Sequence, residues 1–181
     1  MMNIPLETID VWEIDGELTP SDFFQALPHI CIPSDRLVIG SYSPSDHVRK
    51  WLAEHEVSVD RKNSRVPFSA ECFDVNRQEY PLGRAFAIPP GVDQLAELSL
   101  MAKRKGGSTD KDLFFDHVLV YRPGEPLLPL LDFHDAFFGG ALLLSGLFSD
   151  ESAKSFSKSM GARASRIRNP VLSPWPSENL V

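Results

Sequence analysis

The sequence predicts a single α/β domain with a mainly parallel or mixed sheet flanked by helices. Three observations lead to this prediction. The length of 181 residues suits one domain with its own buried core. The last third of the chain alternates strand-like and helix-like patterns, which is typical of parallel strands joined by right-handed crossovers. Within this third, Ala141 to Leu147 form an unbroken apolar run, as expected of a strand buried on both faces.

Capping signals and apolar periodicity place the elements before residue 114. Thr19 or Ser21 begins a short helix that Pro28 stops, and Ser43 followed by Pro44 begins another. The expected elements are a helix over 22–27, a strand over 36–42, a helix over 43–55, an edge strand over 68–75, a strand over 85–88 and a helix over 92–103.

The last third carries the clearest pattern. Pro129 is acceptable in the first turn of a helix, and Gly139 or Gly140 can cap its end. Ser149 or Asp150 then caps a further helix. The expected elements are a strand over 114–121, a helix over 127–138, a strand over 141–147, a helix from 149 or 150 to 160, and a possible strand over 164–167.

We expect one domain over residues 1–181, with a less regular N-terminal arm over 1–35 and an extended proline-rich tail over 169–181. Trp175 lies among three prolines of this tail. It covers an apolar patch of its own domain, or it docks on a protein partner or a second copy, because tryptophan is enriched at binding hot spots.

The net charge of −7 and the pI of about 5.2 argue against binding to nucleic acid or anionic membranes. Cys31 and Cys72 form no CxxC pair, which fits a reducing compartment, although one disulfide between them stays open. The acidic N-terminus has no apolar stretch typical of a secretory signal. The uncharged run from Ala136 to Ser149 is shorter than the roughly 20 residues that a spanning helix needs. We therefore expect a cytoplasmic protein without a membrane segment.

The charge is unevenly distributed. Residues 1–60 hold eleven acidic and three basic residues, whereas 154–181 hold five basic residues and one acidic residue. The basic segment either packs near the acidic half or forms a local anion-binding patch. A third hypothesis is that residues 154–168 contact nucleic acid, although Phe156 is their only aromatic residue.

Histidines near acids or cysteine raise the question of catalysis or metal binding. On the expected helix, His134 lies on the apolar stripe while Asp132 and Asp135 point elsewhere, so a hydrogen-bonded histidine near the core is the favoured interpretation. His29 and Cys31 provide only two of the ligands that a zinc site needs. Neighbouring residues Asp116 and His117 face opposite sides of a strand and cannot form a dyad by adjacency. The sequence therefore predicts no metal site.

Motifs for the commonest nucleotide-binding and hydrolase mechanisms, such as G-x-G-x-x-G and G-x-S-x-G, are absent from the sequence. No cofactor is therefore expected, and no catalytic residue is identified. In an open parallel sheet, ligands bind beyond the carboxyl ends of the strands. Arg122 could hold a carboxylate or phosphate there in bidentate fashion. The candidate residues of this rim are Ser41, Tyr42, Ser43, Tyr121, Arg122, Ser149 and Asp150.

Two main functions follow. The first is a soluble cytosolic binding or regulatory module that docks a protein partner, because the first 60 residues are acidic and no catalytic group is assembled. The alternative is a small enzyme that acts on an anionic small molecule at the carboxyl ends of the sheet strands, anchored by Arg122.

Overall fold

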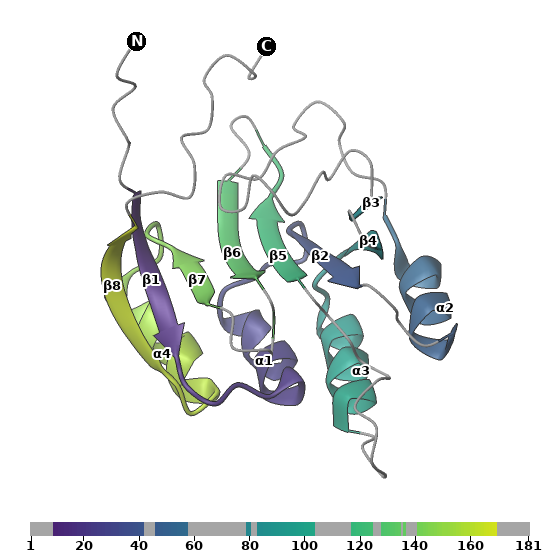
Figure 1. Ribbon diagram of the computed structural model, residues 1–181, viewed down its shortest axis with the longest axis horizontal. Coiled ribbons are helices and arrows are strands. Elements are labelled where there is room, and N and C mark those ends of the chain that lie inside the picture. Colours follow the sequence, from purple (N-terminus) through teal and green to yellow (C-terminus); the bar gives the residue numbers. More distant parts are fainter. Residues whose placement is uncertain are drawn as a thin grey trace.

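The computed structural model contains one eight-stranded sheet with α-helices packed against it (Figure 1). The structure describes residues 9–41, 46–57, 79–80, 83–103, 117–124, 128–134, 136 and 141–169. The elements in these ranges are β1 (Ile9–Asp15), α1 (Pro20–Ala26), the 3-10 helix η1 (Leu27–His29), β2 (Arg36–Ser41), α2 (Asp46–His55), β3 (Glu79–Tyr80), β4 (Gly83–Ile88), α3 (Val92–Lys103), β5 (His117–Arg122), β6 (Leu128–His134), β7 (Leu142–Ser145), α4 (Asp150–Ser159) and β8 (Arg163–Asn169).

The prediction of a mainly parallel or mixed sheet is wrong. The strand order is β3-β4-β2-β5-β6-β7-β1-β8, and each neighbouring pair among the described strands is antiparallel. The error began at residues 127–138, where we expected a crossover helix. Residues Leu128–His134 instead form β6, so β5, β6 and β7 follow one another as an antiparallel meander.

A β-bulge explains how Pro129 is tolerated within this central strand. Val120 pairs with Leu131, but Tyr121 pairs with Pro129, so Leu130 is an extra residue in a β-bulge. A bulge interrupts the ladder of backbone hydrogen bonds, and it is one of the few places in a sheet that accepts a residue without an N–H group.

Most other expected elements are confirmed. β2, β4, β5, β7 and β8 match the predicted strands within three residues at each end, and α1 to α4 match the predicted helices over their described parts. Two caps are also confirmed, because the hydroxyls of Thr19 and Ser149 accept hydrogen bonds from the backbone N–H groups of Asp22 and Ser152. The edge strand expected over 68–75 and the tail beyond residue 169 lie outside the described residues.

The less regular arm expected over residues 1–35 contains two elements of the main body of the fold. Strand β1 lies between β7 and β8, and it pairs with β8 over seven residues from Ile9–Asn169 to Asp15–Arg163. Helix α1 packs against α3, α4 and the sheet. The structure therefore joins the beginning of the chain to its last described strand.

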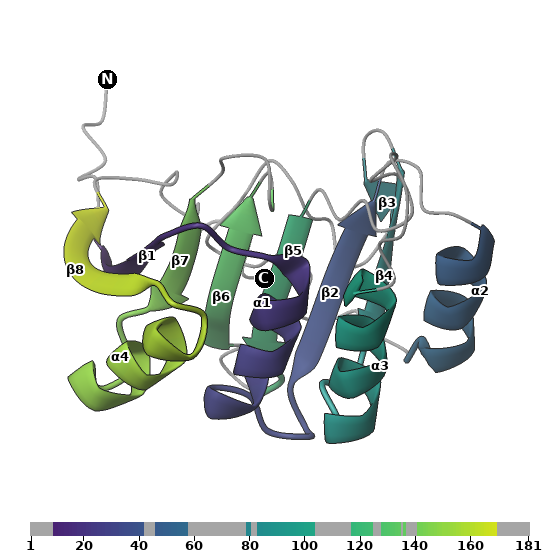
Figure 2. The same cartoon turned by 90° about the horizontal axis from the view of Figure 1, so that it is seen from below.

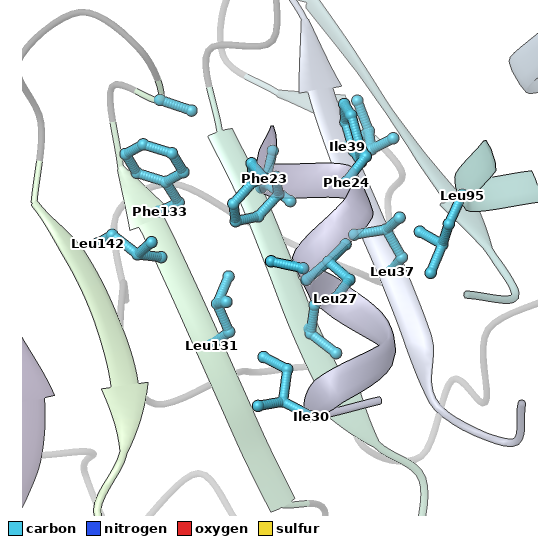
Figure 3. Packing of buried hydrophobic residues seen from close by; sticks show 14 of the residues in the cluster. Phe23, Phe24, Leu27, Ile30, Leu37, Ile39, Leu95, Leu131, Phe133 and Leu142 are labelled. Atoms are coloured by element: carbon cyan, nitrogen blue, oxygen red, sulfur yellow. The ribbon is translucent and has the colours of Figure 1, made fainter. Parts of the chain in front are cut away.

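Helices α1, α3 and α4 cover one face of the sheet, as Figure 2 shows from the side of the helices. Phe23 and Phe24 of α1 and Leu27 of η1 point from the centre of this layer toward the strands (Figure 3). The ring of Phe23 lies 5.4 Å from that of Phe133 on β6 and 5.4 Å from that of Phe24. The apolar side of α1 therefore holds the centre of the core.

The opposite face, here called the second face, is buried as well. Successive residues of a strand alternate between faces, so Val11 and Leu143 turn away from α1. These two buried residues form a separate cluster with Ile167 of β8. Leu119, at the centre of β5, is fully buried on the same side. The described side chains at the centre of β5, β6 and β7 are therefore buried on both faces.

Because Phe23 has no exposed surface, Phe23→Ala should leave a cavity under α1 and lower the free energy of unfolding by about 3–5 kcal/mol. Val92→Ala on α3 is the control, since Val92 is 72% exposed. It should change stability by less than about 0.5 kcal/mol. Urea unfolding followed by circular dichroism measures both, and equal effects would contradict the position of α1 on the sheet.

Candidate functional site

The rim expected at the carboxyl ends of the strands does not form as one edge. Arg36 at the start of β2 pairs with Tyr121 at the end of β5. Ser41 at the end of β2 therefore lies at the opposite edge of the sheet from Tyr121 and Arg122. The reason is the antiparallel pairing, which places neighbouring strands' carboxyl ends at opposite edges.

The remaining rim candidates have local roles or are not described. Tyr42, Ser43 and Trp175 lie outside the described residues. Ser149 and Asp150 follow β7, which runs in the same direction as β5 because both are antiparallel to β6. They lie toward the same edge as Arg122, but Ser149 caps α4, and Asp150 forms an exposed ion pair with Lys154.

Arg122 already has a bidentate carboxylate partner inside the protein. Its Nε lies 2.8 Å from Oδ1 of Asp35, and its Nη2 lies 3.1 Å from Oδ2. Asp35 is fully buried and also accepts a hydrogen bond of 2.9 Å from the N–H of Ile32. The hydrogen bond to Asp35 raises the pKa of Arg122. An anionic ligand would therefore compete with Asp35 for this guanidinium.

Cys31 lies beside this ion pair but has little reactivity. Burial raises the pKa of its thiol to about 12, and the carboxylate of Asp35 adds to the effect. The reactive thiolate is therefore scarce at neutral pH. His29 is exposed at the end of η1, and Cys31 is a free cysteine. The pair does not form the beginning of a metal site.

The second face of the sheet carries a buried carboxyl group. On β6, Asp132 alternates with Leu131 and Phe133, which belong to the core under α1. Its direct neighbours on the adjoining strands are Leu119 of β5 and Leu143 of β7. Asp132 is therefore placed between two leucines on the side away from the helices.

Asp132 lacks the hydrogen bonds that a buried carboxylate ordinarily has. It is 2% exposed, and within the described part of the chain its Oδ1 has no hydrogen-bond partner. Burial raises its pKa to about 7, because the loss of water disfavours the charged form. Asp132 can therefore exchange a proton near neutral pH, which is common for residues at functional sites.

Two histidines are close to Asp132 in the register of the strands. His117 of β5 is fully buried and pairs with His134 of β6. Asp132 and His134 are two residues apart on one strand, so their positions share a face. Our expectation that these two residues diverge is wrong because it assumed a helix. The side chain of His134 and the whole of Asp135 and Asp116 lie outside the described residues.

The spacing of Asp132 and His134 was the signal that could have identified this position. Polar residues at i and i+2 lie on one face of a strand, whereas on a helix they lie about 200° apart. The prediction of a helix rather than a strand therefore separated Asp132 and His134, which a strand places on one face. His117, two strand positions from Leu119, could be added only after the register was known.

A second candidate feature is the outer strand β8. Among the described strands it has a neighbour on one side only, which is β1. Arg163 and Arg166 are exposed, and β8 contains no acidic residue. The Nη2 atom of Arg166 lies 3.4 Å from Oδ2 of Asp10 on β1, and its guanidinium carbon lies 5.6 Å from the centroid of the Trp12 ring. This segment is basic in the sequence, and in the structure its strand β8 packs beside the acidic strand β1.

Among the described side chains, no group of three or more His, Cys, Asp and Glu residues is arranged to hold a metal ion. None of the described helices has the length and apolar composition needed to cross a membrane. No protein family model matches the chain, and comparisons with curated proteins and with solved structures found no similar protein.

Asp132→Asn should change how stability depends on pH. The native carboxyl has a pKa of about 7 in the folded protein, against 3.8 for an ordinary aspartate. The folded state therefore binds more protons than the unfolded state between these values, and stability falls as the pH rises from about 4 to about 7. This difference corresponds to about 4 kcal/mol at most. The variant should lack this loss and be more stable than the native protein at pH 8.

Urea unfolding from pH 4 to pH 8 in the presence of EDTA measures this effect. Asp93→Asn on α3 is the control, because Asp93 is exposed and its removal should leave the pH profile unchanged. Parallel profiles for the native protein and Asp132→Asn would show that Asp132 is charged or hydrated in the folded state.

Arg122→Met should destabilise the fold, because it leaves the buried carboxylate of Asp35 without its cation. We expect a loss of about 2 kcal/mol, less than for a fully buried pair because the Arg122 side chain is 37% exposed. A double-mutant cycle with Asp35→Asn should recover part of this loss. Unchanged stability in Arg122→Met would instead indicate a guanidinium free to bind a ligand.

Proposed function

We propose that the protein is a docking module that binds an acidic, extended segment of a protein partner as an additional strand along β8. The observation that carries this proposal is that β8 pairs with an acidic strand on its inner side and has no neighbour among the described strands on its outer side. An outer strand presents a row of backbone N–H and C=O groups to which an extended peptide can bind.

The pairing of β8 with β1 indicates the chemistry of the partner. Asp10 lies opposite Arg168 in the register, and Asp15 lies opposite Arg163. Opposite charges in directly facing positions stabilise a strand pair, while like charges destabilise it. A partner strand with acidic residues at the same spacing would repeat on the outer side the pairing that β1 makes on the inner side.

The length and regularity of β8 also support strand addition. Its seven residues pair with β1 without a register shift, and β8 contains no proline. Proteins commonly protect an outer strand by making it short, bulged or proline-containing. Arginines alone can also serve as protection, and the experiment below separates this role from binding.

The alternative, an enzyme acting on an anionic small molecule at the carboxyl ends of the strands, has less support. Ser41 lies at the opposite edge of the sheet from Arg122, and Arg122 pairs with Asp35. These groups therefore do not form one anion-binding cluster.

The test uses a labelled peptide with the sequence of residues 9–15, Ile-Asp-Val-Trp-Glu-Ile-Asp, in a fluorescence polarisation titration. We expect saturable binding that weakens with salt, because part of the attraction is between exposed charges. A peptide with lysine in place of its three acidic residues should not bind. Methylation of alternate backbone nitrogens should also abolish binding, because it removes the donors of the strand ladder.

Arg163→Glu should weaken binding of the acidic peptide by about tenfold at low salt, since it places a like charge opposite the peptide. Arg49→Glu is the matched control, because Arg49 is also exposed but lies on α2, which packs against β4. The proposal is overturned if the N-methylated peptide binds as well as the unmodified one, or if a single-stranded oligonucleotide binds and the peptide does not.

A further inference from the structure

We propose that the segment docked on β8 runs antiparallel to it and carries a branched apolar residue followed four positions later by an acidic residue. The apolar residue faces Ile167, and the acidic residue faces Arg163. This inference rests on the proposed docking function, and it names the sequence pattern and the direction of the partner strand.

An apolar cluster on the second face of the sheet ends at Ile167. Val11 of β1 and Leu143 of β7 are buried, and Ile167 packs against them but stays partly exposed. Ile167 pairs with Val11 on its inner side, and among the described strands β8 has no neighbour on its outer side. Facing residues of paired strands lie on the same face of a sheet. An apolar residue opposite Ile167 in an added strand would therefore extend this cluster and be removed from water.

Arg163 and Arg166 of β8 differ in the contacts that they already make. Arg166 lies beside Asp10 and over the ring of Trp12, so its partners are on the inner side of the strand. Arg163 is exposed, and within the described part of the chain it forms no hydrogen bond or ion pair. Arg163 is therefore the arginine that is available to an acidic residue of a partner.

The positions of Arg163 and Ile167 determine the spacing of the partner's side chains. The two residues are four positions apart on one strand, so both lie on the second face. A partner strand must therefore place its acidic and apolar residues four positions apart as well. Because the chain of β8 runs from Arg163 to Ile167, the apolar residue comes first in an antiparallel partner and second in a parallel one.

Two observations favour the antiparallel direction. Each neighbouring pair of the described strands is antiparallel, and this ladder is slightly more stable per residue than a parallel one. The inner partner β1 also has the required pattern, with Val11 opposite Ile167 and Asp15 opposite Arg163. The segment 9–15 is therefore a suitable model for the docked strand.

The test compares two labelled peptides of identical composition by fluorescence polarisation. The first is Ile-Asp-Val-Trp-Glu-Ile-Asp, the sequence of residues 9–15. The second exchanges its valine and glutamate, which keeps the net charge but places the glutamate opposite Ile167. We expect the second peptide to bind about tenfold more weakly, because its carboxylate would lose water beside an apolar cluster.

Ile167→Thr keeps a β-branched residue but places a hydroxyl group beside the valine of the first peptide. It should weaken binding of the first peptide about fivefold and leave the affinity for the second peptide unchanged. Val92→Thr is the matched control, because Val92 is an exposed branched residue on α3, and it should bind both peptides as the native protein does. Circular dichroism verifies that each variant is folded.

A nitroxide label at the C-terminus of the first peptide reports the direction of the bound strand. In the antiparallel arrangement it should broaden the amide NMR signal of Arg163 more than that of Ile167. The inference is overturned if the label broadens Ile167 more, or if the two peptides bind equally well, although docking along β8 would then still stand. If neither peptide binds, the docking function itself is wrong and this inference fails with it.

Discussion

Burial of the central strands on both faces is the constraint on which the other features of this protein depend. β5 is buried from His117 to Tyr121, and β7 is buried over its whole length. A strand in this position is apolar at consecutive residues. A polar side chain on it loses its hydrogen bonds to water and is destabilising unless it gains a hydrogen bond within the protein. This constraint explains the long apolar runs in the sequence. It also explains why the pKa of the Asp132 carboxyl is raised, since this group has lost its contact with water.

The same constraint shows how far the sequence could predict the fold. Local sequence signals were sufficient to predict elements such as the helices capped by Thr19 and Ser149 and the apolar strand β7. The relative direction of neighbouring strands has no such local signal. We took consecutive apolar residues as evidence for parallel strands, because parallel sheets are usually covered on both faces. The central strands of this antiparallel sheet are buried on both faces too. The apolar runs therefore predicted the burial of these strands correctly, but their parallel direction was wrong.

The site was harder to predict than the fold, since it depends on residues that only the register brings together. Reading Leu128–His134 as a helix separated Asp132 from His134, and Pro129 favoured that reading because proline is rare in central strands. The bulge at Leu130 removes the conflict, but a bulge involves the partner strand and leaves no signal in its own segment. Arg122 was noticed for its charge alone. Its partner Asp35 is 87 residues away in sequence, so the ion pair could not be foreseen.

The uneven distribution of charge follows from how β1 and β8 meet. β1 precedes its neighbours β7 and β8 by more than 125 residues in the chain. Contacts so distant in sequence form slowly, and a strand that waits for its partners can pair wrongly with other chains. Asp10, Glu13 and Asp15 give β1 a charge that opposes association of like chains, and Arg163 and Arg168 of β8 match the two aspartates in the final register. The acidic beginning and the basic end of the described chain are therefore two halves of one strand pair. The acidic strand β1 of that pair lies between β7 and β8, whereas the basic strand β8 is one of the two outer strands of the described sheet.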